Sequence, residues 1–335
     1  MSLLNFHFGN PLRSKGGGNI PPKLLELLKK FDETLTKRIR ELIPKDTQVA
    51  SFEWMISAME SICATHEDVK QFITDLELPV SAWDEKWIEV YMDISLTLLD
   101  LCIAFSSDIS RMNQGNILLH CTVYNLTHDF HKHSKRARSS FETWRESISE
   151  KNQKKEKYSD LLNTLKESLD LPKVKNSPKG KLLMSAMYGM KVQTFLVCSV
   201  FSSIFSSTDI MNLDVLESSP WVNAFHELQT SVNKNLEEVF STRKITLEEM
   251  NSVDCAVEKL YPFIEEEIDP KVGLSELKSK VDRFSHVLGV LGKDVDGFFK
   301  VIMSSRDALI SGLRGHSYNM MNKSCSSNRK QLTVK

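Results

Sequence analysis

The densest group of side chains that could bind a metal lies between residues 120 and 133. It comprises His120, Cys121, His128, Asp129, His131 and His133. A zinc site needs three or four such ligands converging on one point. His131 and His133 are two residues apart, which on a helix points them in different directions, and no pair elsewhere has ligand spacing. We therefore expect a solvated helix end or loop here, and we predict no metal or cofactor.

Motifs for covalent or phosphoryl-transfer chemistry are absent from the sequence. No GxSxG turn occurs, and no cysteine has the sequence context of a known nucleophile. The run Gly16-Gly17-Gly18 lacks the preceding strand and the following Lys-Ser or Lys-Thr of a phosphate-binding loop. Carboxylates alternate with Lys and Arg at helical spacing, as on a solvated face. The sequence predicts no catalytic residues, and it favours a protein that is not an enzyme.

A basic segment with interleaved aromatic residues spans 132–145. Its basic residues are Lys132, Lys135, Arg136, Arg138 and Arg145, and its aromatic residues are Phe141 and Trp144. Such a combination can contact anionic lipid or nucleic acid, or it can be the charged face of a surface helix. We favour the surface helix and keep membrane-surface contact through 132–145 as the alternative. The net charge of the chain is −1, so we expect no nucleic-acid partner.

These side chains must be positioned by helices, and the longest predicted helix spans 81–115. Its apolar residues recur every three or four positions for about eight turns: Trp83, Trp87, Val90, Ile94, Leu98, Leu101, Phe105, Ile109 and Met112. Ser81 is a suitable N-cap, and Gly115 is a natural stop. Because Trp83 and Trp87 lie one turn apart on this stripe, we expect both to be buried.

Similar stripes predict helices along most of the chain. One begins at Pro21 or Pro22 and ends before Pro44, and the next spans 52–76 with His66 on its apolar face. Further helices are expected over 178–205, after Pro220, after a capping box formed by Thr246 and Glu249, and over 275–313. The last has coiled-coil-like spacing, but packing inside a bundle is favoured. Gly and Pro number only 13 and 10, which suits an all-α, elongated multi-helix bundle.

The domain organisation follows from the charge and from the breaks between helices. We expect a disordered N-terminal arm at 1–19, an N-terminal helical half at 20–131, a basic helical hinge at 132–177, a C-terminal helical half at 178–314 and a disordered basic tail at 315–335. From residue 132 to residue 181 there are 14 Lys or Arg against 7 Asp or Glu, a net charge of +7. This composition and the prolines near 172–178 mark the hinge.

The stretch 192–208 has two interpretations. It is 17 residues long without a charge, but only nine of them are strongly apolar. A membrane-spanning helix needs about 20 predominantly apolar residues, whereas the central helix of a bundle must be apolar on more than one side. We favour a buried bundle helix over Val192–Phe205. Lys191 is then expected to point out of the bundle or to extend along a groove.

The cysteines and the N-terminal residues bear on the compartment. The six cysteines, at 63, 102, 121, 198, 255 and 325, form no CxxC pair, which is typical of reduced thiols in an intracellular protein. No acidic residue precedes Glu26, a weak indication of an organellar transit peptide. We expect a cytoplasmic protein, with membrane association or a plastid location as alternatives.

Several blocks of sequence resemble the plant BYPASS family nearly from end to end. They are TDLELPVSAWDEKWIEVYMDIS, LLDLCIAFSSDISRMNQG and KLLMSAMYGMKVQTFLVCSVF, with FGNPLR near the start and DVDGFFKVIMSSRDALI near the end. The resemblance implies a regulator of root and shoot growth that restrains a root-derived mobile growth-arrest signal linked to carotenoid metabolism. It supplies no catalytic residues to carry over.

Two alternatives to this function remain open. One is an adaptor linked to the exocyst, the vesicle-tethering complex that a related branch of the family is known to bind. The other is an enzyme or binder acting on the signal or its precursor. A pocket with several convergent polar groups would favour the enzyme or binder, and a closed core with exposed apolar patches would favour a protein-interaction module with an unknown protein partner.

Overall fold

The computed structural model describes residues 21–45, 48–76, 85–149, 155–169, 178–206, 208–215, 219–242 and 246–331. Within these ranges every regular element is an α-helix, which confirms the predicted all-α bundle. The helices are α1 (Pro22–Glu41), α2 (Phe52–Asp75), α3 (Glu85–His128), α4 (Phe130–Ser149), α5 (Lys155–Glu167), α6 (Pro178–Ser206), α7 (Val222–Thr242), α8 (Glu248–Glu265) and α9 (Lys271–Gln331).

Helix α6 lies at the centre of one part of the bundle. It contacts α1, α2, α3, α5 and α7, and every side chain from Leu182 to Ser206 is buried. The burial predicted for Val192–Phe205 is therefore confirmed. By length and composition α6 is the one helix of the described residues that could cross a membrane, but all of its most apolar window is covered by other helices.

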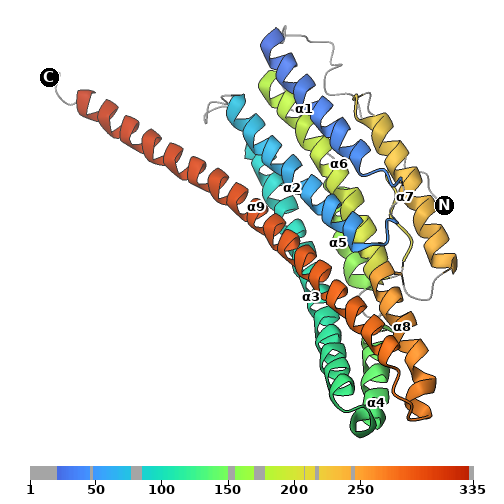
Figure 1. The fold of residues 1–335 in the computed structure, drawn as a ribbon. Coiled ribbons are helices and arrows are strands. Elements are labelled where there is room, and N and C mark those ends of the chain that lie inside the picture. The colour runs from blue at the N-terminus through green and yellow to red at the C-terminus, as the bar shows by residue number, and fades with distance from the viewer. Residues whose placement is uncertain are drawn as a thin grey trace.

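The second organising feature is the long pair α3 and α9, which run antiparallel (Figure 1). Helix α9 also packs on α2 and α8, so its apolar seam from Leu277 to Ile302 is buried inside the bundle. At one end of this pair, α4 reverses the chain against α3 and packs on α8. Asp129, the single residue between α3 and α4, accepts a hydrogen bond from the Lys132 backbone N–H at 3.2 Å and so starts α4.

Gly115 does not end α3, contrary to the prediction. The helix continues to His128, because Leu119, Val123 and Leu126 extend its buried face. A Cβ atom at position 115 would lie 3.0 Å from Cδ1 of Trp144 and 3.1 Å from Oγ of Ser147. The glycine therefore serves the close approach of α4 to α3.

The predicted capping box is also corrected. Helix α8 begins at Glu248, and its N-cap, Leu247, makes no side-chain capping bond. The carboxylate of Glu249 instead accepts the backbone N–H of Phe52 at 3.1 and 3.2 Å, so it caps α2 across the fold. The Ser51 hydroxyl accepts the Trp54 N–H in the same turn. A carboxylate from α8 therefore fixes the start of α2.

Some predictions fall on residues that the structure does not describe, and others on the predicted hinge and tail. The structure does not describe Trp83 or the N-terminal arm 1–19. It describes the backbone of Trp87 and Cys325 but not their side chains. The stretch 132–177 contains α5 and all but the first two residues of α4, and these helices pack on α3, α6 and α8. Its role as a hinge between two halves stays a prediction. Helix α9 runs to Gln331, through most of the tail at 315–335 for which the sequence predicts disorder.

Candidate interaction surface and the buried polar contacts

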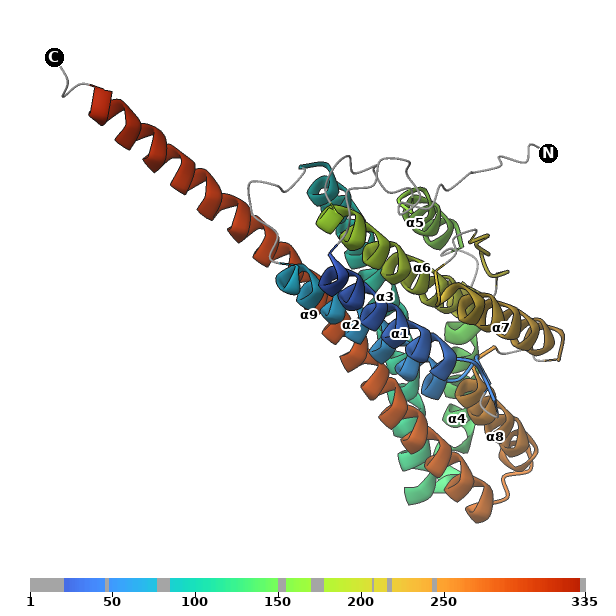
Figure 2. The same cartoon turned by 90° about the horizontal axis from the view of Figure 1, so that it is seen from above.

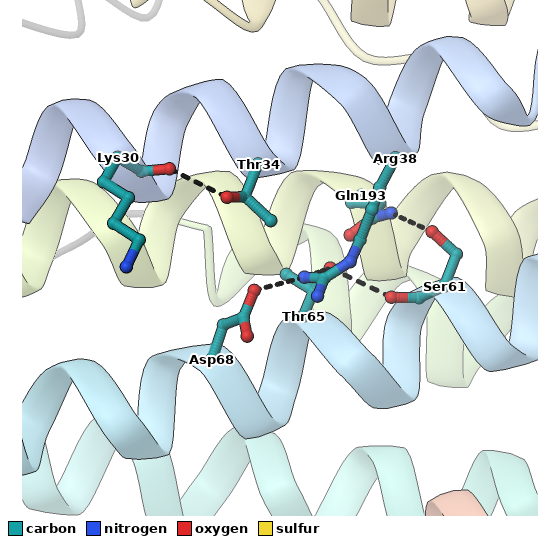
Figure 3. Close-up of polar contacts among 7 residues, drawn as sticks. All are labelled: Lys30, Thr34, Arg38, Ser61, Thr65, Asp68 and Gln193. Atoms are coloured by element: carbon teal, nitrogen blue, oxygen red, sulfur yellow. Dashed lines mark hydrogen bonds and ion pairs between the residues drawn. The ribbon is translucent and has the colours of Figure 1, made fainter.

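A polar cluster joins α1, α2 and α6 (Figure 3). A guanidinium nitrogen of Arg38 on α1 binds the Asp68 carboxylate on α2 and lies 3.3 Å from the Thr65 hydroxyl. Near the same part of α2, Nε2 of Gln193 on α6 donates to the Ser61 hydroxyl at 2.8 Å. These groups bond to one another within the cluster, so its effect is to hold the three helices in register.

His66 lies deeper in the same interface. Its Nε2 atom is 3.1 Å from the Thr194 hydroxyl, and its ring meets Phe298 edge-on with centroids 5.0 Å apart. Its other nitrogen, Nδ1, has no hydrogen-bond partner among the described residues. Burial lowers the pKa of His66 to about 3, so the ring is neutral at physiological pH and joins α2, α6 and α9 as an uncharged core residue.

A buried carboxylate network, which no sequence motif indicated, joins α3, α4 and α5. The Asp108 side chain is fully buried and accepts the Tyr158 hydroxyl at 2.5 Å. Arg111 lies one turn further on, 3.2 Å from the other carboxylate oxygen, and also donates to the Ser147 carbonyl of α4. Burial and the nearby Asp108 charge raise the pKa of Tyr158. The tyrosine therefore stays protonated and remains a donor.

Lys191 does not point out of the bundle, which corrects the prediction made for it. Its side chain is 1% exposed, and its Nζ atom donates to the Ser168 carbonyl at 2.8 Å. Ser168 follows α5, which covers this side of α6, so the ammonium group reaches a carbonyl at a helix end. A carbonyl there lacks an intrahelical donor and carries partial negative charge, which favours a cation.

The histidine-rich stretch at 120–133 is spread over the end of α3 and the start of α4. His120 Nδ1 lies 3.6 Å from an Asp282 oxygen on α9, and His128 packs on Tyr124. No group of three potential metal ligands converges in the described part of the chain. Cys121 and His133 line a small pocket of about 120 Å³ between α3 and α4. The cysteines at 63, 102, 121, 198 and 255 are all free thiols.

The basic segment 132–145 uses much of its charge within the protein. Three of its side chains form ion pairs with α8 and the turn after it: Lys135 with Glu267 at 3.7 Å, Arg138 with Glu265 at 3.1 Å, and Arg145 with Asp254 at 2.6 Å. Its two aromatic side chains are in the core, with Phe141 0% and Trp144 1% exposed. The arrangement is that of a charged surface helix, and membrane contact stays a prediction.

The clearest open surface is a row of apolar side chains on α3, which we call the α3 stripe. It consists of Leu96, Ile103, Ile117 and Tyr124, which are 51%, 54%, 54% and 61% exposed. They are separated by 7, 14 and 7 residues, so they share one face of the helix. The other faces of α3 are buried against α9, α4, α5 and α6. Such a row, with exposed polar residues between its members, is our candidate for a protein-interaction surface.

Fold and polar contacts together define an all-helical bundle protein whose buried polar groups tie its helices to one another. Over 316 residues the chain is 43% identical to "Protein BPS1, chloroplastic" of Arabidopsis thaliana, and the match covers 92% of this chain and 90% of that protein. The chain belongs to the plant BYPASS family of developmental regulatory proteins.

More distant relatives are found in rice. Two proteins named "UPF0496 protein 4", from Oryza sativa subsp. japonica and subsp. indica, are 36% and 35% identical over 266 residues. The match covers 76% of this chain but only 58% of each rice protein. No protein-family model and no solved structure matches the chain.

Proposed function

We propose that this protein is a non-enzymatic interaction protein of plant root and shoot growth, which restrains a root-derived mobile growth-arrest signal. The observation that carries the proposal is the 43% identity to the Arabidopsis protein over 92% of the chain. The α3 stripe supports an interaction role. The polar side chains of the interior described above bond to other helices, so they form no reactive group open to a substrate.

The size of the pocket between α3 and α4 bears on the rival role as an enzyme or small-molecule binder. At about 120 Å³ it is smaller than the roughly 300–1,000 Å³ that sites for drug-sized ligands occupy. A second hollow, of about 600 Å³ at the start of α9, is an open stretch of surface along one helix, so neither of these two forms an enclosed site of that size.

Reciprocal grafting tests the proposed role. Roots that lack the endogenous family members are grafted to wild-type shoots, and this chain is expressed in the roots alone. We expect it to relieve shoot arrest, because the signal is restrained where it is made. A chain carrying Ile103→Asp and Ile117→Asp on the α3 stripe is expected to accumulate normally and fail to relieve arrest. Arrested shoots above roots that express the wild-type chain at normal level would contradict the role.

We also propose a plastid location. Support comes from the Arabidopsis relative, which is named chloroplastic, and from the segment before Glu26, which carries Arg13, Lys15 and Lys23 and no acidic residue. A fluorescent protein fused after residue 335 is expected to enter chloroplasts. A matched fusion with Arg13→Glu and Lys15→Glu is expected to stay in the cytosol. Cytosolic fluorescence from both fusions would instead support the cytoplasmic location predicted from the sequence.

A further inference from the structure

The charged residues exposed beside the α3 stripe are acidic, whereas the chain as a whole is nearly neutral. The exposed acidic residues Asp93 and Asp100 flank Leu96 on its N-terminal part, and no Lys or Arg is exposed along the described stripe. The one arginine of this region, Arg111, is turned inward to Asp108 and the Ser147 carbonyl. The stripe therefore presents apolar side chains beside negative charge. Its complement would be a basic helix with apolar residues.

The last part of α9 has that composition. From residue 308 to residue 335 the chain contains five basic residues, Arg314, Lys323, Arg329, Lys330 and Lys335, and no Asp or Glu. Its apolar residues include Leu313 and Met320. We call residues 311–331 the α9 extension. At 1.5 Å per residue its 21 residues span about 32 Å, enough to cover the α3 stripe from Leu96 to Ile117 but not the whole of its about 42 Å to Tyr124.

The α9 extension leaves the bundle of its own chain. Arg306 donates to the Met92 carbonyl and to the Ser95 hydroxyl, so α9 passes the N-terminal part of α3 at this point. Because the two helices run antiparallel, the following residues of α9 continue beyond α3, as both views show (Figures 1 and 2). One continuous helix does not turn back, so the extension cannot cover the stripe of its own chain.

The α3 stripe is open in a single chain, and the backbone of residues 311–331 extends beyond the bundle (Figure 1). A lone helix of about 20 residues is only marginally stable in water, and it forms when another surface buries its apolar face. The α3 stripe exposes four large apolar side chains on a helix whose other faces pack on the bundle. Opposite charge, with a length that covers most of the stripe, makes each surface the complement of the other.

We infer that the protein forms a two-fold dimer in which the α9 extension of each copy packs on the α3 stripe of the other. Two-fold symmetry uses both surfaces twice and leaves neither open, so the assembly closes at two chains. The inference rests on the proposed interaction role and names an occupant for the surface that supports it. A wild-type chain that is monomeric and still relieves shoot arrest would overturn the dimer and leave that role intact.

Light scattering during size-exclusion chromatography, with sedimentation velocity, tests the dimer on the full chain. The wild-type chain is expected at twice its 38.3 kDa mass. A stripe variant (Ile103→Asp, Ile117→Asp) and an extension variant (Arg314→Glu, Lys323→Glu, Arg329→Glu, Lys330→Glu) are each expected at 38.3 kDa, with the bundle still folded and at most the helical signal of residues 311–331 lost. A matched control, Val272→Asp, alters an exposed apolar residue of α9 outside both surfaces and is expected to remain dimeric.

Mixing and charge exchange separate this arrangement from its alternatives. The stripe variant retains a working extension and the extension variant a working stripe, so their mixture is expected to form a heterodimer. Adding Asp93→Lys and Asp100→Lys to the extension variant is expected to restore the homodimer.

Three results would overturn the inference. They are a monomeric wild-type chain, a stripe variant that stays dimeric through extension-to-extension pairing, and a monomer whose basic extension binds vesicles of phosphatidylserine and phosphatidylcholine instead.

Discussion

Replacing His66 by glutamine should remove most of the acid sensitivity that this one buried ring gives the fold. In the folded protein burial lowers the pKa of His66 to about 3, whereas the pKa in the unfolded chain is about 6.5. Stability from a depressed histidine pKa is fully present above about pH 6.5 and is lost as the pH falls towards 3, because only the unfolded chain takes up the proton. A glutamine side chain would still offer polar atoms to Thr194, and it cannot titrate.

The size of the effect follows from the difference between the two pKa values. Each pH unit below the pKa of the unfolded chain lowers the free energy of unfolding by about 1.4 kcal/mol. As the pH falls from 7.5 to 5.0, His66 should therefore lower the free energy of unfolding by about 2 kcal/mol. Urea unfolding followed by circular dichroism at both pH values measures this difference. His66→Gln is expected to show a pH dependence smaller by that amount, whatever its stability at pH 7.5.

The matched control is His286→Gln, which makes the same substitution at an exposed position of α9. Comparing the pH dependence of the wild type with that of His66→Gln cancels the contribution of every other titrating group. An independent check is the NMR signal of the His66 ring, which should show little protonation above pH 4. An equal loss of stability in wild type and His66→Gln between pH 7.5 and pH 5.0 would refute the reasoning.

Three further predictions concern packing, hydrogen bonding and membrane association. A Cβ at Gly189 would lie 2.6 Å from Cδ2 of Leu35, so Gly189→Ala is expected to cost about 1–3 kcal/mol in urea unfolding. Gly297→Ala, at a helical site with open space, should instead stabilise by about 0.5–1 kcal/mol, and equal effects at both sites would contradict the packing. Tyr158→Phe removes a donor to the buried Asp108 carboxylate and should cost about 1–3 kcal/mol, whereas an unchanged urea midpoint would argue against that bond. Because α6 is buried among other helices, carbonate and high-salt washes should release the protein from membranes, and retention until detergent is added would show that α6 spans the bilayer.

The periodic residues of the sequence predicted the helices well. Apolar spacing and proline positions placed α1, α2 and α6 within about one or two residues of their observed ends, since these signals act within one turn of the chain. Glycine was less informative. The sequence cannot distinguish a glycine that ends a helix from one that admits a neighbour, and Gly115 does the second because Trp144 of α4 packs over it.

The all-helical class, the burial of α6 and the family could all be read from the amino-acid sequence, because periodicity, composition and motif identity are local or direct properties of the chain. Which helix each polar side chain contacts could be seen only in the folded structure. Glu249 caps α2 across 197 positions, Asp108 meets Tyr158 across 50, and Lys191 is drawn inward to the end of α5. Such pairings depend on which helices become neighbours, and a stripe of apolar residues states that a helix needs cover without stating which helix supplies it. For the same reason the row from Leu96 to Tyr124 became visible as an open surface only once the other faces of α3 were seen to be covered.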